Sequence, residues 1–134
     1  ETIQEQARDI ARKIAEALDY VGVLTVELFV TQSAEGTTAL LVNEIAPRVH
    51  NSGHWTLEAC AISQFDNHIR AITGQPLGST RRSSAATMTN LIGGQIDVAA
   101  EMFTKPGASI HNYGKNEARP GRKMGHITQL HDLK

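Results

Sequence analysis

The stretch from residue 39 to residue 56 constrains the fold of this chain more than any other. An apolar, β-prone run at residues 39–42 predicts a strand that delivers an amide and a carboxylate, Asn43 and Glu44, before Pro47 breaks it. The loop that follows carries polar and ionisable side chains at close spacing: Arg48, His50, Asn51 and His54. Packing alone does not require so many polar groups after an apolar strand. We therefore interpret the strand end and the loop as a site held by a rigid element.

Size and composition are those of one soluble domain, or of a piece of a larger one. The chain has 134 residues, of which 40% are hydrophobic and 20% charged, and its net charge of −1 argues against nucleic acid as a partner. No apolar run approaches the roughly 20 residues of a membrane span, so we expect no membrane partner. Cys60 is the only cysteine, which fits a reducing cytoplasm. Because the chain begins at Glu1 without a methionine and enters a helix at once, we expect a fragment.

Two amphipathic helices are predicted. Thr2 and Glu5 fit a capping box at the start of a helix over residues 2–18, whose apolar side chains recur at three- and four-residue spacing. A second helix is predicted over residues 56–73, with Gly74 beyond its end. We expect its buried stripe to consist of Leu57, Cys60, Ala61, Phe65, Ile69 and Ile72.

Between these helices the sequence predicts a β-hairpin, with strands at residues 23–30 and 38–45. A turn centred between residues 35 and 36 makes opposed residue numbers sum to 71, so Glu27 faces Glu44. Like charges directly opposed across two strands are destabilising, and a divalent cation such as Mg²⁺ would compensate. The alternative is a different register, with both glutamates solvated on an exposed face of the sheet.

Histidines in the loop after the second strand are a weak zinc signal. His50 and His54 have three residues between them, but no cysteine or carboxylate partner lies nearby in the sequence. Loop packing is the better interpretation for His54 and Trp55.

A smaller, mainly β unit is predicted beyond a linker at residues 75–80. Strands are expected at residues 85–92 and 108–113, and a last short strand begins at His126. The predicted fold class is therefore α+β, with one domain at residues 1–75 and a second, β-rich domain at residues 76–134.

Residues 115–123 form a cationic tail in this second domain. The segment carries four cationic residues and one acidic residue, Glu117, so its local charge is +3. Pro120-Gly121 stiffens it. The cationic residues are Lys115, Arg119, Arg122 and Lys123. A preformed cationic loop loses less entropy when it binds a phosphate or another anion. The alternative is a solvated surface segment.

Several separated motifs resemble one enzyme family. The longest reads Asn-Glu-Ile-Ala-Pro-Arg at residues 43–48 and continues as His-Asn-Ser-Gly-His-Trp-Thr at residues 50–56. Further matches lie at residues 74–78, 90–93, 113–115 and 119–126. Together they are similar to the N(5)-carboxyaminoimidazole ribonucleotide synthetase family, the ATPases of bacterial and fungal purine biosynthesis in the ATP-grasp superfamily.

This resemblance implies ATP-dependent carboxylation of 5-aminoimidazole ribonucleotide on its exocyclic nitrogen by a cytoplasmic homodimer. Bicarbonate would be phosphorylated to carboxyphosphate, and the amine would then capture carbon dioxide or that mixed anhydride. The resemblance also implies that Glu27 and Glu44 hold the Mg²⁺ that bridges the ATP phosphates, while Asn43 lines the nucleotide pocket. Phosphoryl transfer of this kind needs charge neutralisation and alignment more than covalent help from the protein.

The same resemblance assigns the other polar side chains to bicarbonate and the ribonucleotide. Arg48, with Lys123, would neutralise bicarbonate and its phosphorylated form. His50 and Asn51 would lie near the substrate amine or ribose. Cations of the tail would hold the ribonucleotide phosphate: Lys115, Arg122 and Arg119.

The resemblance covers nearly the whole chain but only the later part of the enzyme, because the family has a substrate domain and a lysine-bearing lobe before it. We therefore expect the carboxy-terminal part of an ATP-grasp domain followed by a small domain, and an enzyme only as the full-length protein. Two alternatives stay open. One is a stable, inactive fragment that retains packing or dimer contacts, and the other is a sister ATP-grasp ribonucleotide ligase or transformylase.

Overall fold

A computed structural model of the chain describes residues 2–32, 34, 36, 38–97, 99 and 106–133. The chain divides into two compact units. The first unit comprises Glu1–Gly53 and Gln64–Gly78, and the second comprises His54–Ser63 and Ser79–Lys134. Residues 54–63 thus group with the second unit, whereas the division into domains at residues 1–75 and 76–134 stays a prediction.

The first unit opens with helix α1, Ile3–Ala17, which starts as its sequence predicts. The Thr2 side chain accepts a hydrogen bond from the Glu5 backbone N–H, and the Glu5 carboxylate accepts one from the Thr2 backbone N–H. This reciprocal pair satisfies two backbone donors that a helix start otherwise leaves without partners, and it also lowers the pKa of Glu5.

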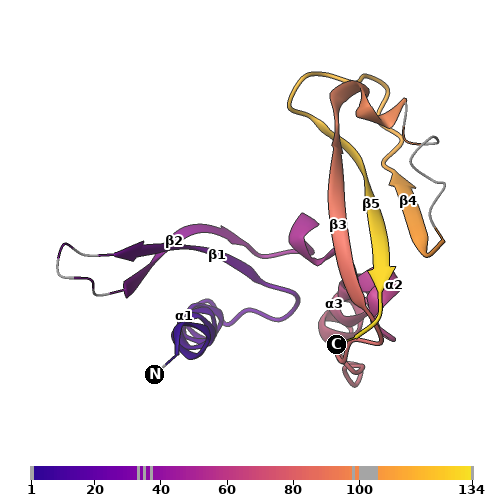
Figure 1. Cartoon of the computed structure of the whole chain (residues 1–134). Coiled ribbons are helices and arrows are strands. Elements are labelled where there is room, and N and C mark those ends of the chain that lie inside the picture. The colour runs from indigo at the N-terminus through magenta and orange to yellow at the C-terminus, as the bar shows by residue number, and fades with distance from the viewer. Residues whose placement is uncertain are drawn as a thin grey trace. The chain divides into compact units, whose positions relative to one another are not determined.

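After α1 the chain forms the predicted hairpin, an antiparallel pair of strands β1, Thr25–Gln32, and β2, Thr38–Ala46 (Figure 1). Within the part of the chain that the structure describes, most side chains of this hairpin are accessible to solvent. Ala46 is buried, but large apolar side chains stand exposed on both strands: Phe29, Val30, Leu41, Val42 and Ile45.

The single helix predicted over residues 56–73 is wrong. The structure has a short α2, Thr56–Ala59, and a separate α3, Gln64–Ile72. Between them Cys60 is extended, with φ −127° and ψ 149°, and forms an isolated β-bridge with Arg82. The predicted buried stripe fails as well, since Leu57, Ile69 and Ile72 are exposed. The four residues between α2 and α3 are not helical, so the periodicity of one continuous helix does not apply to this stretch.

In the second unit, a three-stranded antiparallel sheet has the order β3-β5-β4 (Figure 1). Its strands are β3, Ala85–Ile92, β4, Ala108–Asn112, and β5, Lys123–His131. The last strand therefore begins three residues before the predicted start at His126. A small core lies against the sheet and includes Leu91, Ala99 and Ile127.

Helices and two antiparallel sheets together confirm the α+β class. The described residues also form two 3₁₀ turns, η1 at Asn51–Gly53 and η2 at Gly93–Ile96. Among the residues that the structure describes, no helix has the length and apolar character needed to cross a membrane.

Candidate functional site

Glu27 and Glu44 are directly opposed across the hairpin. From Thr25 to Glu27 the paired residue numbers sum to 71, but from Leu28 onward they sum to 70. The turn is therefore centred one half-residue earlier than expected, and a β-bulge at Asn43 restores the predicted pair. The opposition of the two glutamates was predicted correctly, although the uniform register that supported it was wrong.

The same bulge brings Asn43 to the carboxylates. In a regular strand, neighbouring side chains point to opposite faces, so Asn43 would face away from Glu44. Instead, the Asn43 side-chain amide donates a hydrogen bond of 3.3 Å to Oε2 of Glu27. Bulges beside functional sites commonly redirect one side chain in this way. An amide and two carboxylates thus lie close together on the hairpin.

A histidine from the following loop completes this cluster. Nε2 of His50 lies 3.5 Å from Oε1 of Glu27, and the His50 side chain is only 12% exposed. Nδ1 of His50 lies 2.8 Å from the Ser52 hydroxyl and accepts a hydrogen bond of 3.3 Å from the Ser52 backbone N–H. Because Nδ1 is an acceptor, a neutral His50 carries its proton on Nε2, the atom that faces Glu27.

Gln64, at the start of α3, holds the His50 backbone from both sides. Its Oε1 accepts a bond of 3.0 Å from the His50 N–H, and its Nε2 donates one of 2.8 Å to the His50 carbonyl. A Cβ on Gly53 would lie 2.5 Å from Oε1 of Gln64, so glycine leaves room for this clamp. The sequence did not point to Gln64, because the predicted long helix placed it in mid-helix and its partner lies 14 residues away.

Two other predicted residues of the first unit lie in the same loop. Arg48 is exposed, and its guanidinium donates to the neighbouring Val49 carbonyl at 3.0 Å. Asn51 is half-buried and begins η1. Both follow the strand that carries Glu44, as the sequence suggested.

Three of the predicted anion-binding residues, Lys115, Arg119 and Arg122, lie on an exposed loop between β4 and β5, and the fourth, Lys123, begins β5. Nζ of Lys115 donates a hydrogen bond of 2.6 Å to the backbone carbonyl of Lys123, which ties the Lys115 side chain to the start of β5. Arg119 forms an ion pair of 2.8 Å with the exposed Glu117, and Arg122 donates to the Glu117 backbone carbonyl at 3.3 Å. Glu117 therefore offsets one of the four positive charges of the loop.

Stacked aromatic rings surround His126 on β5 in the same unit. His111 stacks on it with ring centroids 4.6 Å apart, and His54 with centroids 5.2 Å apart. Burial lowers the pKa of His126 to about 4, helped by His111 and His54 and opposed by Glu58. His126 is therefore neutral at neutral pH. From the sequence, His54 was a weak zinc candidate better interpreted as loop packing, and His126 marked a strand start at the end of a family motif.

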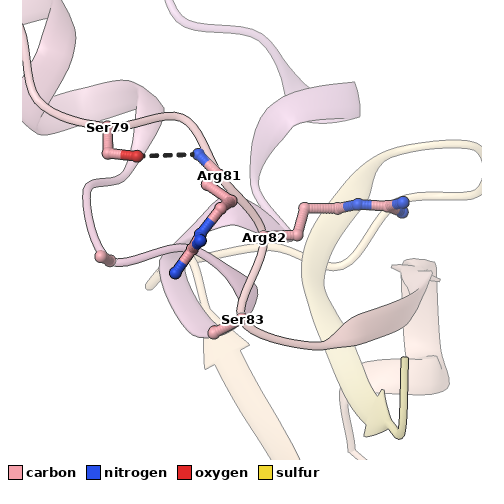
Figure 2. A pocket seen from close by; sticks show the side chains of 5 residues that line it. Ser79, Arg81, Arg82 and Ser83 are labelled. Carbon is pink, nitrogen blue, oxygen red and sulfur yellow. Dashed lines mark hydrogen bonds between the residues drawn. The ribbon is translucent and has the colours of Figure 1, made fainter. Parts of the chain in front are cut away.

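A cavity of about 380 Å³ lies beside the segment that leads into β3. It is lined by five residues, none of them predicted as part of a site: Ala61, Ser79, Arg81, Arg82 and Ser83. Figure 2 shows the two arginine side chains extending in different directions, while the Arg81 backbone N–H donates to the Ser79 hydroxyl at 3.2 Å. The guanidinium groups do not converge on one point, so the cavity lacks a built anion site.

Comparisons with known proteins define the class first. Residues 1–65 match the ATP-grasp domain, and residues 86–134 match the phosphoribosylaminoimidazole carboxylase C-terminal domain. A curated relative from Brucella melitensis, N5-carboxyaminoimidazole ribonucleotide synthase, is 56% identical over 94% of this chain and 34% of its own length. The chain belongs to the family of N5-carboxyaminoimidazole ribonucleotide synthases, which confirms the resemblance, and it spans about a third of the length of the relatives it matches.

Solved structures from Aspergillus clavatus agree with this assignment. One is a carboxyaminoimidazole ribonucleotide synthase complexed with ATP, 42% identical, with a TM-score of 0.83 over 95% of this chain and 34% of its own. Another is the synthase in complex with ADP and 5-aminoimidazole ribonucleotide, also 42% identical, with a TM-score of 0.82 over 96% of this chain and 35% of its own.

Proposed function

We propose that the whole protein is an ATP-dependent carbon–nitrogen ligase that carboxylates 5-aminoimidazole ribonucleotide to the N5-carboxyamino product. The observation that carries the proposal is the opposed pair Glu27 and Glu44, with Asn43 turned toward it by the bulge. Related structures hold ATP, and ADP with that ribonucleotide, which supports the substrate assignment. Bicarbonate, a homodimer and a cytoplasmic location belong to the same proposal.

The carboxylate pair fits Mg²⁺. This ion prefers one or two carboxylates and keeps its other coordination positions for water and substrate phosphates. Here two carboxylates are directly opposed and accessible to solvent. When bound, Mg²⁺ neutralises charge on the ATP phosphates. Asn43 holds Oε2 of Glu27, and each carboxylate oxygen has lone pairs beyond one such contact with which it could bind the ion. His50 reaches the same carboxylate and so couples the loop to the metal site.

The roles of the cationic side chains depend on whether the anion that each would bind is formed during the reaction. Phosphorylation of bicarbonate creates a new anion during the reaction, and Arg48 and Lys123 would stabilise it. The phosphate of the ribonucleotide does not react, so Lys115 and Arg122 would supply constant binding. Arg119 is the weaker candidate for that phosphate because Glu117 already pairs with it. Asn51, beside His50, would orient the substrate amine or ribose.

The test is kinetic and uses the full-length protein. Glu27→Gln, Glu44→Gln and the double variant are compared for ADP release that depends on both bicarbonate and aminoimidazole ribonucleotide. Each single change should cost several orders of magnitude in rate and the double change little more, as for residues that act as a unit. Glu16→Gln, an exposed carboxylate on α1, is the matched control. Small, additive losses would refute the metal pair, and stimulation by another ribonucleotide would indicate a sister ligase.

A further inference from the structure

Three ionisable side chains converge in the second unit, apart from every residue assigned above. Glu58 comes from α2, His111 from β4 and His126 from β5, and one ligand atom of each lies within 4.8 Å of the other two. His111 and His126 are directly opposed in the β4–β5 register, with rings 18° from parallel. Gly125 permits this approach, because a Cβ there would collide with the His111 carbonyl oxygen.

Buried polar atoms in this cluster lack partners. His126 is 1% exposed, and its Nε2 makes no hydrogen bond within the described part of the chain. Oε2 of Glu58 is also buried without a partner, whereas Oε1 lies 2.5 Å from Nε2 of His111. A buried polar atom without a partner is destabilising, because it has lost its hydrogen bonds to water and gained none in return. A ligand that accepts electron pairs from both would remove these penalties.

We propose that Glu58, His111 and His126 form a binding site for a divalent transition-metal cation of the Zn²⁺ class. Two imidazole nitrogens and one carboxylate oxygen are a donor set that suits Zn²⁺ and leaves a fourth position for water. Mg²⁺ is a poor match, because it prefers oxygen ligands.

The surroundings supply what such a site needs beyond its ligands. The Tyr113 hydroxyl lies 2.8 Å from Nδ1 of His126. If Nδ1 donates its proton to that hydroxyl, Nε2 presents a lone pair. Metal-bound histidines usually donate their other ring N–H to an oxygen in this way, which fixes the orientation of the ring. The His111 side chain is 37% exposed and gives the ion a path from solvent. The proton that Glu58 and His111 share must leave this contact when the ion binds.

The function of the bound ion would be structural. Helix α2 has only four residues and meets the sheet of the second unit mainly at β5. A cation held by Glu58, His111 and His126 would join this short helix to two strands. Because the unfolded chain does not hold these groups together, the free energy of metal binding adds to the free energy of unfolding.

The experiment uses the metal-stripped 134-residue chain, with Co²⁺ as a spectroscopic probe and Zn²⁺ as competitor. We expect one Co²⁺ per chain with the visible absorption of four-coordinate geometry, displacement by Zn²⁺ but not by excess Mg²⁺, and a higher melting temperature with Zn²⁺. His111→Ala should weaken binding more than about 100-fold. Tyr113→Phe should weaken it by roughly 10-fold, because the hydroxyl only orients the ring of His126. The control is His131→Ala, which changes an exposed histidine on β5, the strand of His126, and should bind like the unchanged chain.

His111→Ala is preferred to His126→Ala because His111 is partly exposed, so its loss leaves the buried strand intact; Glu58→Gln, which keeps size, is the second ligand variant. Circular dichroism verifies that each variant is folded. The proposal is overturned if the unchanged chain takes up no Co²⁺ or Zn²⁺ at micromolar concentration. It is also overturned if His111→Ala and Glu58→Gln bind as tightly as His131→Ala.

Discussion

Removal of the Gln64 clamp should loosen the loop that carries His50. Gln64→Ala deletes both hydrogen bonds to the His50 backbone, at 3.0 Å and 2.8 Å, in a part-buried setting. At about 0.5–1.5 kcal/mol for each bond, the expected cost is about 1–3 kcal/mol. Alanine is at least as good a helix former as glutamine, so α3 itself should not weaken. The loss therefore falls on the loop and on the 3.5 Å approach of His50 to Glu27.

Amide hydrogen exchange of the His50 N–H measures this directly, because that group donates to Oε1 of Gln64. A cost of about 1–3 kcal/mol corresponds to roughly 5- to 150-fold faster exchange through local opening. Gln64→Met keeps the volume and removes the hydrogen bonds, so it should behave like Gln64→Ala. Gln4→Ala, an exposed glutamine in the first turn of α1, is the control.

Two outcomes would contradict the reasoning. If Gln64→Met leaves exchange at His50 within about twofold of the unchanged chain, packing rather than hydrogen bonding positions the loop. If Gln4→Ala accelerates exchange at His50 as much as Gln64→Ala does, the effect is global loss of stability and not a local clamp.

Three further predictions follow from the same structure. The isolated chain, which spans about a third of its relatives' length, should show no ribonucleotide-stimulated ATP hydrolysis, and measurable ADP release above a buffer blank would contradict this. In steady-state kinetics of the full-length protein, Arg122→Ala should mainly raise KM for the ribonucleotide, by a factor that corresponds to about 2–4 kcal/mol of binding free energy if the contact with the phosphate is buried in the complex. Arg48→Ala should instead lower kcat. An unchanged KM for Arg122→Ala would reject the phosphate role. Gly125→Ala should destabilise the second unit by about 1–3 kcal/mol in urea unfolding, while Gly94→Ala, which has room for a Cβ, should have little effect; equal effects would count against the close approach of β4 and β5.

The sequence correctly predicted those elements that depend on residues close together in the chain. The capping box needs only Thr2 and Glu5, and β-prone residues on both sides of a turn were enough to find the hairpin. The helix over residues 56–73 failed because its break depends on distant partners. The Ala59 carbonyl accepts bonds from the backbone N–H and the hydroxyl of Ser83, 24 residues away. Helical periodicity carries no information about such a contact.

The candidate site shows the same limit at the scale of single residues. The pair of Glu27 and Glu44 followed from a register rule, but the bulge at Asn43 that makes the rule succeed is not visible in residue spacing. The bulge turns the amide of Asn43, the residue before Glu44, toward the carboxylate of Glu27. Gln64 was missed for a related reason, since its role depends on the fold of a loop rather than on a motif.

Donor chemistry separates the two proposed cation sites more sharply than their positions in the chain. Glu27 and Glu44 offer only oxygens on an open edge, where an ion can keep its water and exchange it for phosphates. Glu58, His111 and His126 offer two nitrogens and one oxygen, with two unpartnered buried atoms. An ion in the first site would therefore take part in the proposed reaction and would have to release its phosphate ligands at each turnover. An ion in the second would be retained, because its departure would leave a buried histidine and a buried carboxylate unsatisfied again.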